Sequence, residues 1–210
     1  MTDILLDRPT GSLAAAAIGN ENDILTRIHD PLVQLAHWQR PRPSTLSWLD
    51  TLDWRGIDDI DTTVSGPRFG PQVTRLLHDA GYPQASQTGM LAEEIVVRAS
   101  QFARLMTCTA LRLRLEVIET DACRKFHMDY VTARLLMPLL GPGTQWKDAN
   151  PGAAVNQIEI GNVCILKGRR WVDEPVILHR SPPIAGTGQT RLLLALDPAN
   201  TDAPAESLRI

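Results

Sequence analysis

Cysteine is scarce in this chain of 210 residues, which contains only Cys108, Cys123 and Cys164. The number is odd and no Cys-x-x-Cys pair occurs, which argues against a disulfide framework and against a structural zinc knuckle. Reduced thiols are usual in the cytoplasm. The first residues, Met-Thr-Asp-Ile-Leu-Leu-Asp, carry acids where a signal peptide carries bases. The sequence therefore predicts a cytoplasmic protein.

Long apolar runs and an excess of charge of one sign are also missing. The apolar run 13–18 is far too short to span a bilayer. Twenty-four acidic residues face 21 scattered Lys and Arg, for a net charge of −3. Neither a membrane nor a nucleic acid is therefore expected as a partner. The apolar fraction of 43% is that of an ordinary globular protein with one substantial core.

The first hundred residues carry mostly helical patterns. Asp30-Pro31 has an N-cap residue before a proline at the first helical position, which predicts a helix through Leu35 and Ala36. Further helices are expected from Ser44, over residues 73–80 and, most clearly, over residues 90–106, where apolar residues recur every three or four positions. Residues 54–70 read as a long loop. A homodimer is a possible assembly, in which the helix at 90–106 would form part of the contact.

From Leu111 the apolar period changes to two, which indicates a half-buried strand at 111–117. More strands are expected at 126–137, 155–160, 163–167, 175–179 and 190–196, separated by turn signals such as Gly141-Pro142-Gly143. Short strands at this spacing favour a sandwich or barrel. We expect an α+β protein with a helical N-terminal portion (1–108), a β-rich portion (109–198) packed with it in one compact domain, and a loosely ordered tail (199–210).

Two histidines and one aspartate in the β-rich portion have the residue types of a metal site. His127 and Asp129 are two positions apart, so on an extended strand both side chains leave the same face. His179, at the end of a later strand, would complete a 2-His-1-carboxylate triad with open positions, as in non-haem Fe(II) oxygenases. The same three residues could instead hold Zn²⁺, or form a hydrogen-bonded polar trio without a metal.

An arginine near these residues could hold an anionic co-substrate through its guanidinium fork. Arg191 follows His179 on the next predicted strand, whereas Arg134 and Arg114 lie on strands of their own. All three remain candidates on the sequence alone.

Several motifs in the β-rich portion resemble one bacterial family, the domain of unknown function 1826. The motifs are Cys-Arg-Lys-Phe-His-Met-Asp (123–129), Arg134-Leu-Leu, Gly141-Pro-Gly-Thr-Gln-Trp146, Leu166-Lys-Gly168, His179-Arg-Ser-Pro-Pro183 and Arg191-Leu-Leu-Leu. The resemblance is densest over residues 110–197. It implies no activity.

A wider resemblance is to the 2-oxoglutarate/Fe(II) dioxygenases, carried by His127-x-Asp129, His179 and Arg191 on a strand-rich background. That resemblance implies a cupin-like double-stranded β-helix, or jelly roll, in the C-terminal half. It implies that His127, Asp129 and His179 bind Fe(II) and that Arg191 pairs with the distal carboxylate of 2-oxoglutarate. The substrate would be an unknown small molecule or protein. One competing interpretation is a cupin-like protein that binds zinc and either senses the metal or hydrolyses a substrate. The other is a binding protein without a metal.

Overall fold

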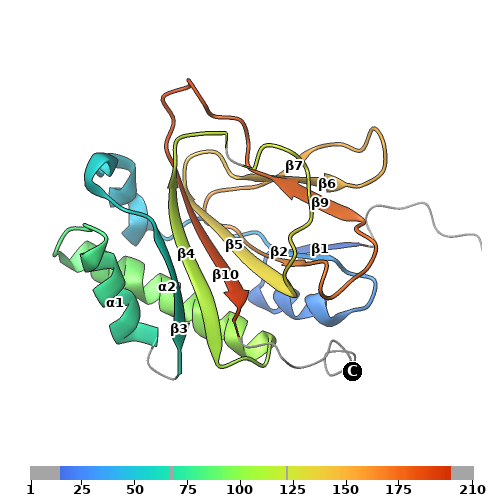
Figure 1. Ribbon diagram of the computed structural model, residues 1–210, viewed down its shortest axis with the longest axis horizontal. Coiled ribbons are helices and arrows are strands. Elements are labelled where there is room, and N and C mark those ends of the chain that lie inside the picture. Colours follow the sequence, from blue (N-terminus) through green and yellow to red (C-terminus); the bar gives the residue numbers. More distant parts are fainter. Residues whose placement is uncertain (1–14, 67–68, 122, 200–210) are drawn as a thin grey trace, which may run out of the picture.

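The protein is described by a computed structural model over residues 15–66, 69–121 and 123–199, and its centre is two β-sheets (Figure 1). The larger sheet has seven strands in the order β1-β2-β8-β5-β10-β4-β3. β1 and β2 run parallel, and every other neighbouring pair in this sheet is antiparallel. Its strands are β1 (Ala16–Gly19), β2 (Leu35–Trp38), β3 (Ile60–Ser65), β4 (Ala110–Ile118), β5 (Ala133–Leu140), β8 (Val163–Lys167) and β10 (Arg191–Pro198).

The smaller sheet has three antiparallel strands in the order β7-β6-β9. They are β6 (Thr144–Asp148), β7 (Asn156–Ile158) and β9 (Ile177–Arg180). Figure 1 shows this sheet on the opposite side of the large sheet from the helices. The chain therefore has helices, a large sheet and a small sheet as successive layers.

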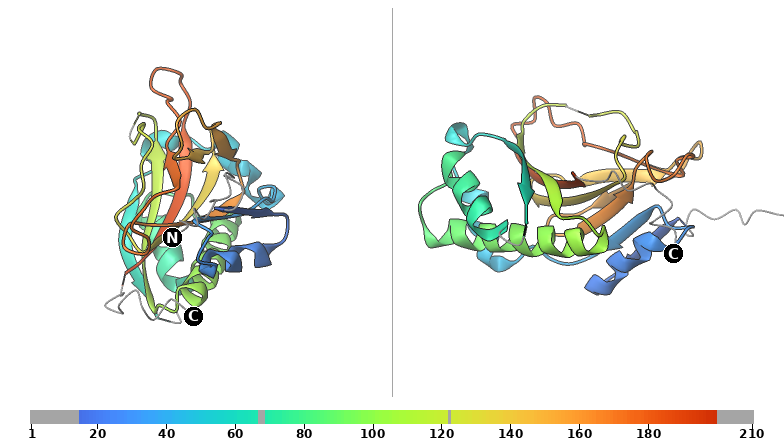
Figure 2. Two further views of the ribbon diagram at one scale, coloured as in Figure 1. Left: turned by 90° about the vertical axis from the view of Figure 1, so that its right-hand side faces the viewer. Right: turned by 60° about the horizontal axis from the view of Figure 1, so that its bottom comes forward.

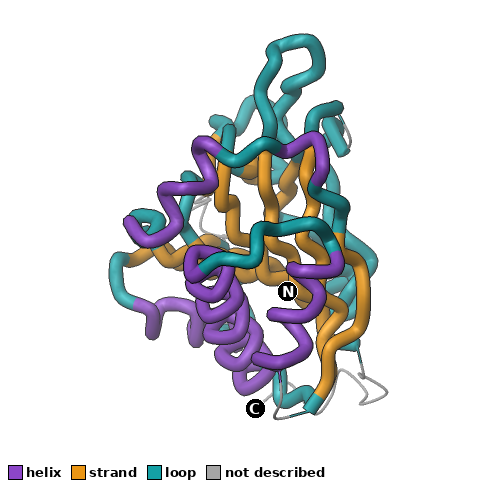
Figure 3. Tube along the Cα trace, turned by 90° about the vertical axis from the view of Figure 1, so that its left-hand side faces the viewer, coloured by secondary structure: helices purple, strands orange, loops and turns teal. Residues whose placement is uncertain are grey.

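Two α-helices, α1 (Phe69–Asp79) and α2 (Ser86–Leu105), cover one face of the large sheet, as Figures 2 and 3 show from other sides. Alternate residues of the strands point to these helices because successive side chains on a strand leave opposite faces. Leu113 of β4 and Leu194 of β10 are buried in one cluster with Ile95 and Phe102 of α2. Full burial stabilises each such side chain by about 1.5–3 kcal/mol. This cluster is the main hydrophobic core.

The other face of the large sheet packs against the small sheet. Leu136 of β5 and Leu193 of β10 are buried together with Trp146 of β6 and Ile177 of β9. The large sheet is therefore buried on both faces in its middle. Polar residues of the same inner face, such as Arg134 and Arg191, lie between the two sheets as well.

One predicted helix is wrong. The segment after Asp30-Pro31 forms strand β2, in which Leu35 and Ala36 are both fully buried. A strand with apolar residues on both faces loses the period of two that would have indicated it. Asp30 does not begin a helix: it follows the 3-10 helix η2 (Asn22–His29), and its side chain accepts a hydrogen bond from the backbone of Leu32.

The segment 54–70 is also more regular than predicted. It holds a short 3-10 helix, η4 (Trp54–Gly56), and strand β3, which forms an edge of the large sheet. The N-terminal portion is therefore not purely helical, since it supplies three strands. The helix expected from Ser44 is a 3-10 helix, η3 (Ser44–Thr51).

The two α-helices and several of the remaining strands lie near their predicted positions, whereas β1 and η2 were not predicted. Helix α2 corresponds to the helix expected at 90–106, α1 to the one at 73–80, and β8 has the predicted bounds. The strand expected at 126–137 begins only at Ala133. Strand β6 was not predicted. The tail, beyond residue 199, lies outside the described residues. Among the residues described, no helix is long and apolar enough to cross a membrane.

Candidate metal centre

The structure brings His127, Asp129 and His179 together at one end of the space between the two sheets. One potential ligand atom from each lies within 4.8 Å of the other two. His179 belongs to β9, whereas His127 and Asp129 lie in the irregular segment before β5. Among the described residues, this is the one group of three or more His, Cys, Asp or Glu side chains that could hold a metal ion.

The two histidines are held side by side by their backbones. The amide of His127 donates to the carbonyl of His179 at 3.0 Å, and the amide of His179 donates back at 2.9 Å. Residues paired in this way on antiparallel segments have side chains on the same face. Their ring centroids are 4.7 Å apart. A single isolated bridge between two segments of distant sequence therefore sets the spacing of both imidazoles.

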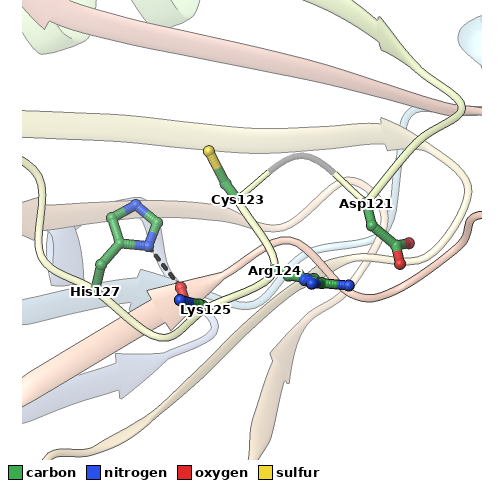
Figure 4. Close-up of a pocket in the computed structure, with 5 residues that line it drawn as sticks. All are labelled: Asp121, Cys123, Arg124, Lys125 and His127. Carbon is green, nitrogen blue, oxygen red and sulfur yellow. Dashed lines mark hydrogen bonds between the residues drawn. The ribbon is translucent and has the colours of Figure 1, made fainter.

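A backbone carbonyl determines which nitrogen of His127 faces the site. Nδ1 lies 2.8 Å from the carbonyl oxygen of Lys125, and a carbonyl can only accept, so Nδ1 donates (Figure 4). Nε2 then faces Oδ1 of Asp129 at 3.5 Å. A histidine whose other ring nitrogen donates to a backbone carbonyl is the usual arrangement at metal sites.

Asp129 has one carboxylate oxygen without a hydrogen bond. Oδ2 is buried and accepts no hydrogen bond from any described residue, although Nε2 of His179 lies only 3.0 Å away. Two ligand atoms on adjacent octahedral positions, each about 2.1 Å from a metal, are separated by about 3 Å. The short approach without a hydrogen bond therefore suits two atoms that share one cation.

The charges around Asp129 keep its carboxylate ionised. Burial opposes ionisation, but the contacts with His127 and His179 and the positive charge of Arg134 outweigh it and hold the pKa of Asp129 well below its usual range. The Asp129 carboxylate in turn, more than the opposing effect of burial, raises the pKa of His127 above 6.5. The carboxylate of Asp129 is thus a negative charge that a cation at this position would balance.

The three candidate arginines have very different partners. Arg134 has one nitrogen 2.6 Å from Asp129 and is also paired with Asp197, and Arg114 lies near Asp197 and Glu116. Both are thus already balanced by carboxylates. These strand-to-strand pairs are not visible in the sequence, because they depend on β5, β10 and β4 being neighbours.

Arg191 is buried, and its hydrogen-bond partners among the described residues are all neutral, although the more distant carboxylate of Glu116 favours its charged form. Its guanidinium donates to the carbonyl of Pro142 at 2.7 Å and to the hydroxyl of Ser181 at 3.0 Å, and lies 3.5 Å from the hydroxyl of Thr144. Burial lowers the pKa of Arg191 to about 10, so the group still carries its charge at neutral pH. A buried cation without a counter-ion is a place where an anion would be stabilised.

The turn Gly141-Pro142-Gly143 holds Arg191 in place. Gly141 has a φ of 72°, and a Cβ there would lie 2.3 Å from the carbonyl oxygen of Thr190. A Cβ on Gly143 would lie 1.8 Å from the carbonyl oxygen of Ile158. Only glycine permits these approaches. The motif is explained by packing around the arginine.

A cavity of about 100 Å³ lies against the three ligand-type residues. Arg114, Glu116, Arg134, Thr144 and Ser181 also line it. Arg191 does not line it, but its guanidinium contacts the hydroxyls of Thr144 and Ser181, which do. Neither of these two residues was predicted. The sequence feature that could have indicated them is their place in the motifs: Thr144 lies in the same motif as Trp146, and Ser181 in the same motif as His179.

A second, more open hollow of about 380 Å³ adjoins His127. Figure 4 shows Arg124 and Asp121 on the side of this hollow away from His127. The carboxylate of Asp121 accepts from the backbone amides of Ile184 and Ala185, which gives it a structural role. The hollow is open to solvent, and His127 is one of the residues that line it.

Two other residues from the motifs have packing roles. Trp146 is buried between the sheets. Lys167 ends β8, donates to the carbonyl of Asp30 and lies 5.0 Å from the ring centroid of Trp171.

The chain belongs to the family described as "Protein of unknown function (DUF1826)", whose model matches residues 19–197. This confirms the resemblance drawn from the sequence. A curated relative, 8-amino-7-oxononanoate synthase 1 of a Polaromonas species, is 31% identical over 116 residues. That match covers 50% of this chain but only 27% of the synthase, so it does not carry the activity of the synthase to this chain.

Solved structures of dioxygenases have a similar fold. Dioxygenase for auxin oxidation 1 of Arabidopsis thaliana, in complex with 2-oxoglutarate, aligns with a TM-score of 0.53 and 11% identity over 90% of this chain and 94% of that one. The corresponding rice dioxygenase aligns with a TM-score of 0.51 and 13% identity, over 88% of this chain and 82% of that one. At such identity the likeness establishes a shared mixed α/β, strand-rich fold.

Proposed function

We propose that this protein is an Fe(II)- and 2-oxoglutarate-dependent oxygenase that hydroxylates a substrate still to be identified. The observation that carries the proposal is one juxtaposition. Three ligand-type side chains converge on a cavity, and a buried arginine that forms no ion pair with a described carboxylate contacts the hydroxyls of Ser181 and Thr144, which line the same cavity. The layered arrangement, with the site between two sheets, is what we expect of a double-stranded β-helix, and the similarity in fold to dioxygenases supports that assignment.

The donor set fits a divalent cation. Nε2 of His127, Nε2 of His179 and one oxygen of Asp129 would hold the metal on one side and leave its other positions open. When bound, Fe(II) and 2-oxoglutarate supply the oxidising chemistry: O₂ is consumed, 2-oxoglutarate leaves as succinate and CO₂, and one oxygen atom enters a C–H bond of the substrate. The protein fixes the three donors and surrounds them with a partly closed cavity.

Arg191 is the residue that would bind the distal carboxylate of 2-oxoglutarate. Arg134 and Arg114 are engaged with carboxylates, so a new anion would have to compete with these ion pairs. Arg191 is not engaged in an ion pair with any described carboxylate, and the hydroxyls of Ser181 and Thr144 would share the anion at the cavity wall. Charge-assisted hydrogen bonds of this kind are about twice as strong as neutral ones.

The second candidate function is a zinc site without oxygenase activity. The observation that favours it is the donor set itself, since two imidazoles, one carboxylate and an open position are also the ligands of catalytic zinc. Such a protein would hydrolyse a substrate or sense the metal. An uncompensated Arg191 has no evident role in that function, and we therefore rank it second.

The proposed setting is the cytoplasm, with a small molecule or a protein side chain as substrate. The free thiols of Cys108, Cys123 and Cys164 support a reducing compartment. Neither a nucleic acid nor a membrane surface is part of the proposal, because the basic residues are balanced by acids.

The experiment that tests the proposal is anaerobic absorption spectroscopy of metal-stripped protein. Fe(II) is added first and 2-oxoglutarate second. A weak visible charge-transfer band that needs both additions is expected in the wild type and in His78→Ala, a control at an exposed histidine of α1. The band should be absent in His179→Ala. Arg191→Gln should keep the metal but need far more 2-oxoglutarate.

No band in the wild type, together with tight binding of one zinc per chain, would refute the oxygenase and favour the zinc site. A band that persists unchanged in His179→Ala would show that the metal lies elsewhere.

A further inference from the structure

Arg134 joins Asp129 to a second buried carboxylate. Its Nε and Nη2 donate to the two oxygens of Asp197 at 2.7 and 2.8 Å. Its Nη1 lies 2.6 Å from Oδ1 of Asp129. The exposed fractions of the three side chains are only 13%, 6% and 16% for Arg134, Asp197 and Asp129. One guanidinium therefore uses three nitrogens on two carboxylates.

The two hydrogen bonds with Asp197 fix the direction in which Nη1 of Arg134 points. Guanidinium is planar, and two parallel hydrogen bonds to Asp197 set the orientation of that plane. Nη1 then points to Asp129 without any further freedom. Arg134 and Asp197 lie on neighbouring strands, β5 and β10, in the middle of the large sheet, so their backbone positions are set by hydrogen-bonded strands with a partner on each side.

Asp129 itself has no such support from secondary structure. It precedes β5 in an irregular segment, where its carbonyl accepts a hydrogen bond from the amide of Arg169. That bond places the backbone but leaves the side chain free to rotate. With Oδ1 held by Arg134, Oδ2 is the oxygen that faces His179.

We propose that the pair formed by Arg134 and Asp197 positions Asp129 as a metal ligand: Arg134 holds Oδ1 and so presents Oδ2 to the ion. The inference rests on the proposed function for the presence of a metal. It removes Arg134 from the co-substrate site and gives it a separate role. Partners of metal-ligating side chains typically contribute about 10–100-fold to metal affinity.

The test is titration of metal-stripped protein with Co²⁺, followed by its visible absorption bands. Arg134→Lys keeps the charge but cannot hold two carboxylates in fixed directions. Asp197→Asn keeps Arg134 but weakens the bond that orients it. The matched control is Arg112→Lys, since Arg112 makes a similar two-bond contact with Asp61, at 2.7 and 2.6 Å, on the exposed part of β4 and β3.

Both test variants should bind Co²⁺ at least tenfold more weakly than wild type and show changed band intensities, because the Asp129 oxygen is displaced. Arg112→Lys should remain within about twofold of wild type. The unfolding temperatures of the metal-free variants show whether each is folded. If Arg134→Lys does not fold, Asp197→Asn decides the question.

The outcomes separate the two proposals. If wild type binds one Co²⁺ per chain while Arg134→Lys and Asp197→Asn match Arg112→Lys in affinity and spectrum, the positioning role is overturned and the proposed function stands. If wild type binds no Co²⁺, the proposed function itself fails, and the positioning role fails with it.

Discussion

Oδ2 of Asp129 and Nε2 of His179 lie 3.0 Å apart, and yet no hydrogen bond reaches that oxygen from any described residue. The two atoms meet because His179 is anchored in β9 and through its backbone bridge to His127, while the guanidinium of Arg134 turns the carboxylate toward it. This spacing suits the two atoms as ligands of one cation, as proposed above, and it leads to the first prediction.

Asp129→Asn should remove metal binding. The amide cannot supply a charged oxygen, and its NH₂ group would be repelled by the guanidinium of Arg134. We expect the affinity for Co²⁺ or Zn²⁺ to fall by more than about 100-fold. This loss is larger than the one caused by substituting a residue that only supports a ligand. Isothermal titration calorimetry measures it. Asp121→Asn is the control, because Asp121 bonds only backbone amides, and an equal loss there would contradict the assignment.

Metal affinity should rise with pH above 6.5. The pKa of His127 is raised above 6.5, chiefly by the Asp129 carboxylate, so at any pH below that raised pKa this imidazole must lose a proton before it binds a metal. Below that raised pKa the apparent affinity should gain up to about tenfold per pH unit, and it should level off above it. Titrations at several pH values with a non-chelating buffer measure the slope.

In the metal-free protein, the contribution of His127 to stability should decrease as the pH rises, whereas metal affinity increases. A raised pKa in the folded state means that protonated His127 stabilises the fold, and this stability is lost as the pH rises through that pKa. Urea unfolding of metal-free protein at several pH values, with His127→Gln as the comparison, measures the difference. A wild-type stability that rises with pH relative to the variant would contradict the coupling to Asp129.

Gly168→Ala should displace the segment that carries Asp129. A Cβ at this position would lie 2.0 Å from the carbonyl oxygen of Val131 and 3.0 Å from that of Asp129. We expect a loss of about 1–3 kcal/mol in the free energy of unfolding, as for other overpacked sites, together with weaker metal binding. Urea unfolding and Co²⁺ titration measure the two effects. Gly89→Ala in α2, where a Cβ meets nothing within 4 Å, should instead stabilise the protein slightly.

The three thiols should differ widely in reactivity. Cys123 is exposed and adjoins His127, whereas burial raises the pKa of Cys164 to about 12 and also raises that of the half-buried Cys108. A thiol reagent such as DTNB should therefore modify about one cysteine rapidly in the folded protein, and Cys123→Ser should abolish this phase. A rapid phase that survives in Cys123→Ser would show that one of the two buried thiols is accessible.

The sequence by itself determined the residue types of the candidate site and much of the secondary structure. His127-x-Asp129, His179 and Arg191 could be singled out because few residue types bind metals or anions. The position of α2 followed from local periodicity, and the bounds of β8 followed from an apolar run between the turn signals Gly161-Asn162 and Lys167-Gly168. Strand β2 could not be found in this way, since Leu35 and Ala36 are both buried and the alternation that marks a strand is lost.

Only the tertiary structure decided how these residues are used. Arg134, Arg114 and Arg191 are equivalent in the sequence, and their roles separate because β5, β10 and β4 are neighbours in one sheet. That order places Asp197 between Arg134 and Arg114, where it balances both, and leaves Arg191 with neutral partners. The physical reason is the separation of the interacting residues along the chain. Hydrophobic periodicity is a pattern among residues a few positions apart, whereas the pairing of buried charges depends on contacts between strands that are distant in the chain.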